Sequence, residues 1–188
     1  MNHFRVMIAA ALFCVAVSVR AQTPIKPATI YDQNGITVVS PNQPGWISLK
    51  AEKSETVFEK RGEGGILNAS VKTIRTQTFE TDKERLAGWE TLKQAELSKL
   101  KRDSIHFNYT GFKGATCLQY DGIFPIEKTS SSHYAYFNLR GYLCRHPDAK
   151  DSAVQLEFTN YSNTRGLTED LYSLSEEFFE KITFPKRQ

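Results

Sequence analysis

Three polar residues in the C-terminal half of the chain could form a hydrolytic site. His133 and His146 could each act as a general base, since histidine titrates near neutral pH, and Asp121 could orient one of them. No nucleophile-elbow sequence surrounds a serine, and His106 and His133 suit solvated strand positions. We therefore expect no catalytic residue. An exported hydrolase built from His133, His146 and Asp121 remains an alternative.

A short run of possible metal ligands begins at the last cysteine. Cys144, His146 and Asp148 offer sulfur, nitrogen and oxygen donors within five residues. No second ligand pair follows at zinc-like spacing, so four ligands cannot be assembled from the sequence. We expect no bound metal and no cofactor, and assign Cys144 to a structural bond instead.

Cys117 and Cys144 are predicted to form a disulfide, because an even number of cysteines in an exported chain favours pairing. If they face each other across an antiparallel hairpin, the register places Tyr120 opposite Gly141 and Asp121 opposite Arg140. These are favourable cross-strand neighbours. The connection would then be the small polar segment 129–132.

The elements that would position these residues are short strands and two helices. Strands are expected within 31–40, 46–51, 55–60 and 66–78, then at 105–110, 115–124, 133–145 and 153–161. Thr81 and Glu84 form a capping box that starts a helix over about 82–102, with an apolar face of Leu86, Trp89, Leu92, Leu97 and Leu100. A second helix is expected over about 168–181. Because the strand at 133–145 is apolar on both faces, we expect a helix over each face of the sheet.

The first 21 residues have the layout of a secretory signal. A short basic start, Met1–Arg5, precedes an apolar run at 6–19, and the pattern predicts cleavage between Ala21 and Gln22. Cys14 follows the bulky Phe13, which disfavours a lipid anchor there. The run is too short for a membrane span, and the rest of the chain contains none. We expect a periplasmic or secreted protein with a flexible leader at 22–30 and one domain over 31–188.

The charge of the mature chain is close to neutral. The whole sequence carries +3, of which Arg5 and Arg20 supply two positive charges in a signal without acids, leaving +1. A near-neutral chain lacks the basic surface that holds a phosphate backbone, so we expect no nucleic acid partner.

Two stretches resemble the PsbP/Mog1-like family. Residues 35–46 (GITVVSPNQPGW) are similar to its opening strand, proline and tryptophan, and residues 176–184 (EEFFEKITF) to its closing helix and apolar segment. The resemblance implies an α/β/α sandwich with a central antiparallel sheet. It also implies non-catalytic work, since members serve as extrinsic photosystem subunits, as a partner of a small GTPase, and as bacterial envelope proteins.

These observations predict a non-catalytic exported protein that binds another envelope protein or a small ligand. A structural envelope component is a further alternative. A pocket between helix and sheet would indicate a ligand carrier, whereas an exposed apolar patch would indicate a protein-binding module.

Overall fold

The computed structural model describes residues 23–101, 103–127 and 133–185, and the signal sequence with its cleavage site lies outside them. The helices are α1 (Asp82–Leu97) and α2 (Glu169–Glu180). The strands are β1 (Thr23–Pro24), β2 (Ile30–Gln33), β3 (Ile36–Val39), β4 (Ile47–Glu52), β5 (Glu55–Gly62), β6 (Gly65–Arg75), β7 (Ser104–Phe112), β8 (Ala115–Pro125), β9 (Tyr136–Arg145) and β10 (Ser152–Ser162).

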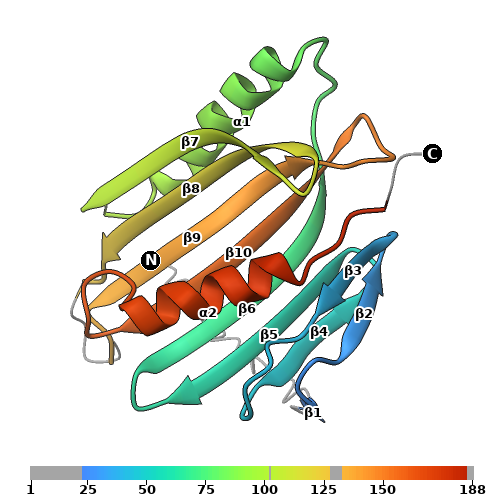
Figure 1. The fold of residues 1–188 in the computed structure, drawn as a ribbon. Helices are drawn as coiled ribbons and strands as arrows, with labels where there is room; N and C mark the ends of the chain where they lie inside the picture. Colours follow the sequence, from blue (N-terminus) through green and yellow to red (C-terminus); the bar gives the residue numbers. More distant parts are fainter. Residues whose placement is uncertain (1–22, 102, 128–132, 186–188) are drawn as a thin grey trace, which may run out of the picture.

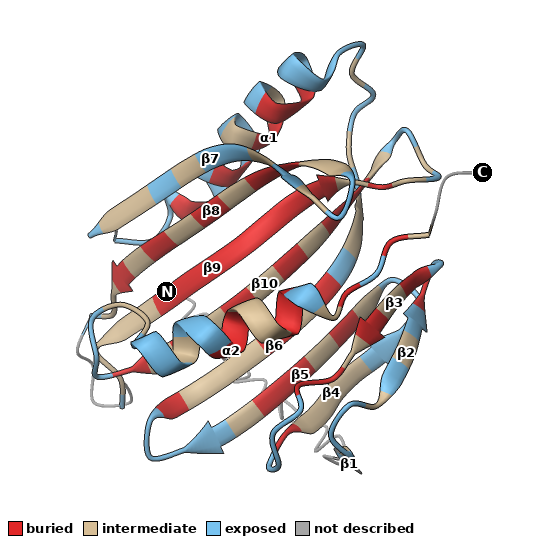
Figure 2. Cartoon of the chain, in the orientation of Figure 1, coloured by how far each residue is buried: buried red, intermediate tan, exposed pale blue. Residues whose placement is uncertain are grey.

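Eight strands form one antiparallel sheet in the order β1-β4-β5-β6-β10-β9-β8-β7, and β2 and β3 form a separate hairpin (Figure 1). The inner strand β9 is buried along almost its whole length (Figure 2). Both faces of β9 are covered, each by a different helix, so that even its polar residues Asn138 and Arg140 are buried.

On one face the core is formed under α2 and the β2–β3 hairpin. Phe178 and Phe179 of α2 pack on sheet residues such as Phe58 and Tyr142, and Phe178 meets Phe58 edge to face at 6.4 Å between ring centroids. Trp46 is 1% exposed and belongs to the same cluster.

On the opposite face α1 covers the outer part of the sheet. Its Leu86 and Trp89 pack on β8 and β9 through Leu118 and Leu143. The Thr81–Glu84 capping box is present as predicted: Glu84 N–H donates to Thr81 Oγ1 at 3.2 Å and Thr81 N–H to Glu84 Oε2 at 3.1 Å.

The expected α/β/α sandwich is wrong. Of the described residues 49% lie in strands and 18% in helices, so the fold is mostly antiparallel sheet rather than a sheet between helical layers. Strands lie about 4.8 Å apart and a helix is about 10 Å wide, so one helix covers only two or three of the eight strands. The sequence showed two amphipathic helices but not how wide the sheet between them is.

The predicted disulfide is present. Cys117 and Cys144 are bonded and fully buried, and β8 and β9 pair in the expected register, with Tyr120 opposite Gly141 and Asp121 opposite Arg140. The connection predicted at 129–132 lies outside the described residues.

Two local expectations need correction. The described part of the segment expected to be a flexible leader is held at the sheet edge, where Thr23–Pro24 pairs with β4 and Ile25 N–H donates to Trp46 O at 3.2 Å. Helix α1 ends at Leu97 rather than near 102, because the chain turns there to start β7.

Candidate functional site

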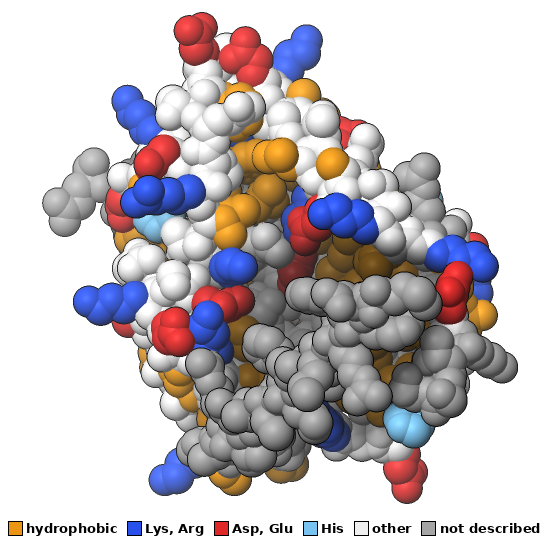
Figure 3. Space-filling model, turned by 180° about the vertical axis from the view of Figure 1, so that it is seen from behind, with side chains coloured by type: hydrophobic (Ala, Val, Ile, Leu, Met, Phe, Trp, Pro, Cys, Tyr) orange, Lys and Arg blue, Asp and Glu red, His pale blue; other side chains and the backbone are white. Residues whose placement is uncertain are grey.

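A cavity of about 840 Å³ opens between the C-terminal end of α1 and the sheet. We call it the α1 cavity. Most of its lining is apolar. In the view from behind, recessed hydrophobic side chains lie among charged ones on this face (Figure 3). The lining consists of Glu96, Leu97, Lys99, Leu100, Lys101, Phe124, Pro125, Ile126, Glu127, Phe137, Leu139, Glu157 and Tyr161.

The cavity lies where the chain leaves the C-terminal end of α1. Trp89 is 1% exposed and Leu97 6% exposed, so the helix is packed down as far as its last residue. The chain then turns, with Leu100 N–H donating to Leu97 O at 3.0 Å, and leaves Leu100 41% exposed. The helix end therefore forms a wall, and the ends of β8, β9 and β10 form the floor.

An aromatic row lines the floor. Phe124 lies opposite Phe137 in the β8–β9 register, and Phe137 lies opposite Tyr161 in the β9–β10 register. The ring centroids are 5.6 Å and 4.9 Å apart, respectively. Cross-strand neighbours on one face contact each other directly, so three strands together present a continuous aromatic surface.

Glu157 is the charged residue that the described strands contribute to this cavity. Its Oε1 accepts hydrogen bonds from Tyr120 Oη at 2.7 Å and from Lys93 Nζ at 3.1 Å. Lys93 also forms an ion pair with Glu96 at 2.9 Å. Burial, followed by the charge of Glu157, raises the pKa of Tyr120 well above its usual value, so its hydroxyl remains a donor.

A glycine makes the contact between Tyr120 and Glu157 possible. The two residues lie on β8 and β10, and Gly141 of β9 lies between them in register. A Cβ at Gly141 would lie 2.8 Å from the Tyr120 hydroxyl oxygen and 2.6 Å from Leu156 O. The missing side chain leaves room for the tyrosine to cross β9 and reach the carboxylate.

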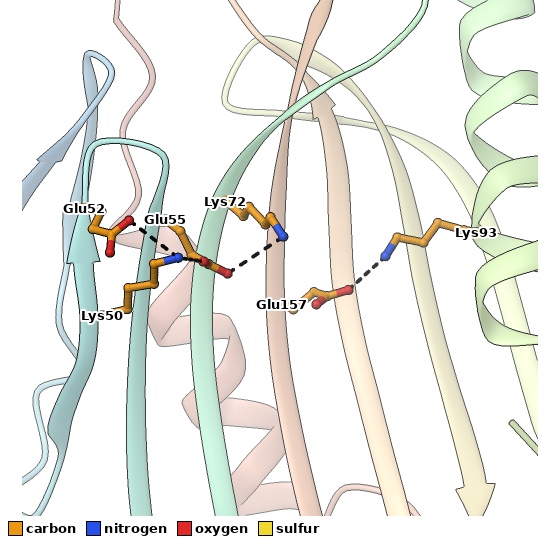
Figure 4. Close-up of polar contacts among 6 residues, drawn as sticks. All are labelled: Lys50, Glu52, Glu55, Lys72, Lys93 and Glu157. Carbon is orange, nitrogen blue, oxygen red and sulfur yellow. Dashed lines mark hydrogen bonds and ion pairs between the residues drawn. The ribbon is translucent and has the colours of Figure 1, made fainter. Parts of the chain in front are cut away.

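Beyond the reach of α1 the same face becomes charged (Figure 4). Glu55 of β5 lies between two lysines, with Lys50 Nζ at 2.5 Å and Lys72 Nζ at 3.9 Å, and Lys50 also meets Glu52 at 3.6 Å. These side chains are partly exposed, and exposed ion pairs contribute little stability. Glu55 and Glu157 thus share a face, but only Glu157 lines the cavity.

The residues suspected of hydrolytic chemistry do not share one site. His133 lies before β9 and His146 after it, so a strand of ten residues, about 33 Å long, separates them. His146 is buried and accepts from Asp148 N–H at 3.2 Å. Asp121 lies on the α2 face, between His106 and Arg140 in register, beside a smaller cavity of about 290 Å³.

Sequence reasoning missed Lys93, Tyr120 and Glu157 as a group. One signal was present: Leu86, Trp89, Lys93 and Leu97 recur every three or four residues, which places Lys93 on the packed face of α1. Leu92 and Leu100 were assigned to that face instead, but they are 55% and 41% exposed, whereas Lys93 is 3% exposed.

The described residues contain no candidate metal site and no candidate membrane-spanning helix. Within the described ranges, no three His, Cys, Asp or Glu side chains lie close enough together to hold a metal ion. Neither of the two described helices is long and apolar enough to cross a membrane.

Comparisons with known proteins show no family. No family model matches the chain, and no curated protein is significantly similar, so the resemblance to PsbP/Mog1-like proteins stays a prediction. A protein of unknown function from Pseudomonas aeruginosa is similar in structure at a TM-score of 0.49 and 13% identity, over 86% of this chain and 99% of that one. A protein from Bacteroides thetaiotaomicron reaches 0.46 at 13% identity, over 88% of this chain and 50% of its own length.

Proposed function

We propose that this protein is an exported, non-catalytic carrier that binds a small, largely apolar molecule in the α1 cavity. The observation that carries the proposal is the cavity itself. Its volume of about 840 Å³ lies within the range of about 300–1,000 Å³ that is typical of small-molecule sites. Of its thirteen lining residues, eight are apolar or aromatic and five are charged, and small-molecule sites combine an apolar lining with polar groups that orient the ligand.

The aromatic row supports a small ligand rather than a protein partner. Phe124, Phe137 and Tyr161 lie recessed on the floor beneath the wall formed by α1 and are not part of a flat exposed patch. A flat apolar patch would favour a protein surface, whereas a recessed one encloses most of a small ligand.

Export is supported by the signal-like sequence at 1–21 and by the disulfide, because such bonds persist mainly in oxidising compartments. Cell fractionation followed by N-terminal sequencing tests this part. We expect the protein in the periplasmic or secreted fraction, starting at Gln22. A cytosolic protein that still begins at Met1 would contradict it.

Binding can be tested with N-phenyl-1-naphthylamine, a neutral dye whose fluorescence rises in apolar sites. We expect saturable binding to the purified protein. Leu100→Asp places a charge in the cavity wall and should weaken binding at least fivefold. Leu92→Asp is the matched control, because Leu92 is an exposed leucine of α1 outside the cavity. Absent binding, or equal effects of the two variants, would overturn the proposal.

A further inference from the structure

Resting on the proposed function, we propose that the α1 cavity selects apolar molecules with a cationic amine head and discriminates against those with a carboxylate head. The selecting group is the carboxylate of Glu157 on the cavity floor.

Among the described residues, hydrogen-bond donors reach one oxygen of that carboxylate. Both hydrogen bonds to Glu157, from Tyr120 and from Lys93, end on Oε1. Oε2 has no partner among the described residues, and the side chain is 20% exposed where it lines the cavity. An ionised carboxylate only accepts hydrogen bonds, so Oε2 can accept one from a donor group on the ligand.

Lys93 cannot bind the carboxylate head of an anionic ligand. Its ammonium group meets Glu157 at 3.1 Å and Glu96 at 2.9 Å, and lies 4.8 Å from the Tyr120 ring centroid. Its side chain is 3% exposed and does not line the cavity. A ligand carboxylate therefore finds no free donor on Lys93, and its charge would lie next to that of Glu157.

The least exposed charged residue of the cavity lining favours a cation. Glu96, Glu127, Lys99 and Lys101 also line the cavity, but all four are exposed, and water and salt screen their charges. Glu157 is only 20% exposed, and the one ammonium group beside it, that of Lys93, is shared with Glu96. The less screened charge is that of Glu157 on the floor.

Three probes of equal chain length test the selectivity: decylamine, decan-1-ol and decanoate, each titrated calorimetrically into the purified protein at pH 7. We expect decylamine to bind at least tenfold more tightly than decanoate, with the alcohol between them. Equal affinities, or tighter binding of decanoate, would overturn this inference and leave the proposed function intact. Failure of all three to bind would overturn both.

Glu157→Gln tests the assigned residue. The amide oxygen can still accept from Tyr120 and Lys93, and the amide nitrogen then presents a donor to the cavity. The preference for decylamine over decanoate should fall at least tenfold. Glu55→Gln is the matched control, since it removes a lysine-paired carboxylate from the same face outside the cavity (Figure 4). An unchanged preference in Glu157→Gln, or an equal loss in both variants, would contradict the assignment.

Discussion

The hydroxyl of Tyr120 donates to Glu157 across an intervening strand, at 2.7 Å. This hydrogen bond links β8 directly to β10, although β9 lies between them. It fixes the position of the carboxylate on the cavity floor. Three features allow it: the strand register, the absence of a side chain at Gly141, and the buried ammonium of Lys93 beside the same oxygen.

Gly141→Ala should destabilise the fold and displace the tyrosine. The added Cβ would lie 2.8 Å from Tyr120 and 2.6 Å from the Leu156 carbonyl oxygen, and such overpacking costs about 1–3 kcal/mol. Urea unfolding measures the loss. Gly111→Ala is the control, because its new Cβ would meet nothing closer than 4.0 Å. An equal effect of the two substitutions would contradict the close packing described at Gly141.

The contribution of Tyr120 to stability should decrease at alkaline pH. Burial and Glu157 raise the pKa of Tyr120 above 10.0 in the folded protein, so the folded state holds this proton more tightly than the unfolded state. The stabilisation is complete below pH 10 and is lost as the pH rises from there toward the folded pKa. The difference in unfolding free energy between wild type and Tyr120→Phe should therefore shrink as the pH rises above about 10. A constant difference would contradict this.

The disulfide should contribute about 3–4 kcal/mol to the free energy of unfolding, because it closes a loop with a sequence separation of 27 residues. Urea unfolding of the Cys117→Ala, Cys144→Ala double variant, compared with wild type, measures it. A reductant should not affect the double variant, which serves as its own control. A loss below about 1 kcal/mol would show that the bond constrains the chain less than this loop length implies.

The contribution of Arg140 to stability should depend on Glu176, its ion-pair partner on α2. It is 2% exposed, forms an ion pair with Glu176, donates to Ser175 Oγ at 2.9 Å and lies 3.9 Å from the Tyr172 ring centroid. Glu176→Gln leaves a buried cation without its charge partner and should cost about 1–3 kcal/mol, at the low end because Glu176 is partly exposed. Adding Arg140→Met should restore most of the loss in a double-mutant cycle. Additive losses would contradict the coupling.

Local features of the fold followed from the sequence, whereas its layering did not. The paired cysteines set the β8–β9 register, and the Thr81–Glu84 box set the start of α1, because both depend on neighbours in sequence or across one hairpin. The candidate site could not be predicted in the same way, because it depends on the order in which distant strands lie in the sheet. Glu157 reaches Tyr120 only because β10 lies beside β9, and Lys93 reaches both only because α1 crosses this part of the sheet.

The prediction of helical layers on both sides of the sheet was wrong for the same reason. Hydrophobic periodicity reports which face of each element is buried but not how many strands stand side by side. A single helix per face could not cover an eight-stranded sheet, which left one region charged around Glu55 and another hollow around Phe137. The hollow is the candidate site.

The most direct measurement is a methyl NMR titration of the purified protein with decan-1-ol. The account predicts saturable shifts at methyl groups that line the α1 cavity, those of Leu97, Leu100, Ile126 and Leu139. It predicts no shifts for Leu156 and Leu174, which lie in the core between α2 and the sheet. Shifts confined to that second core, or no saturable shifts at all, would contradict the claim that this cavity binds apolar ligands.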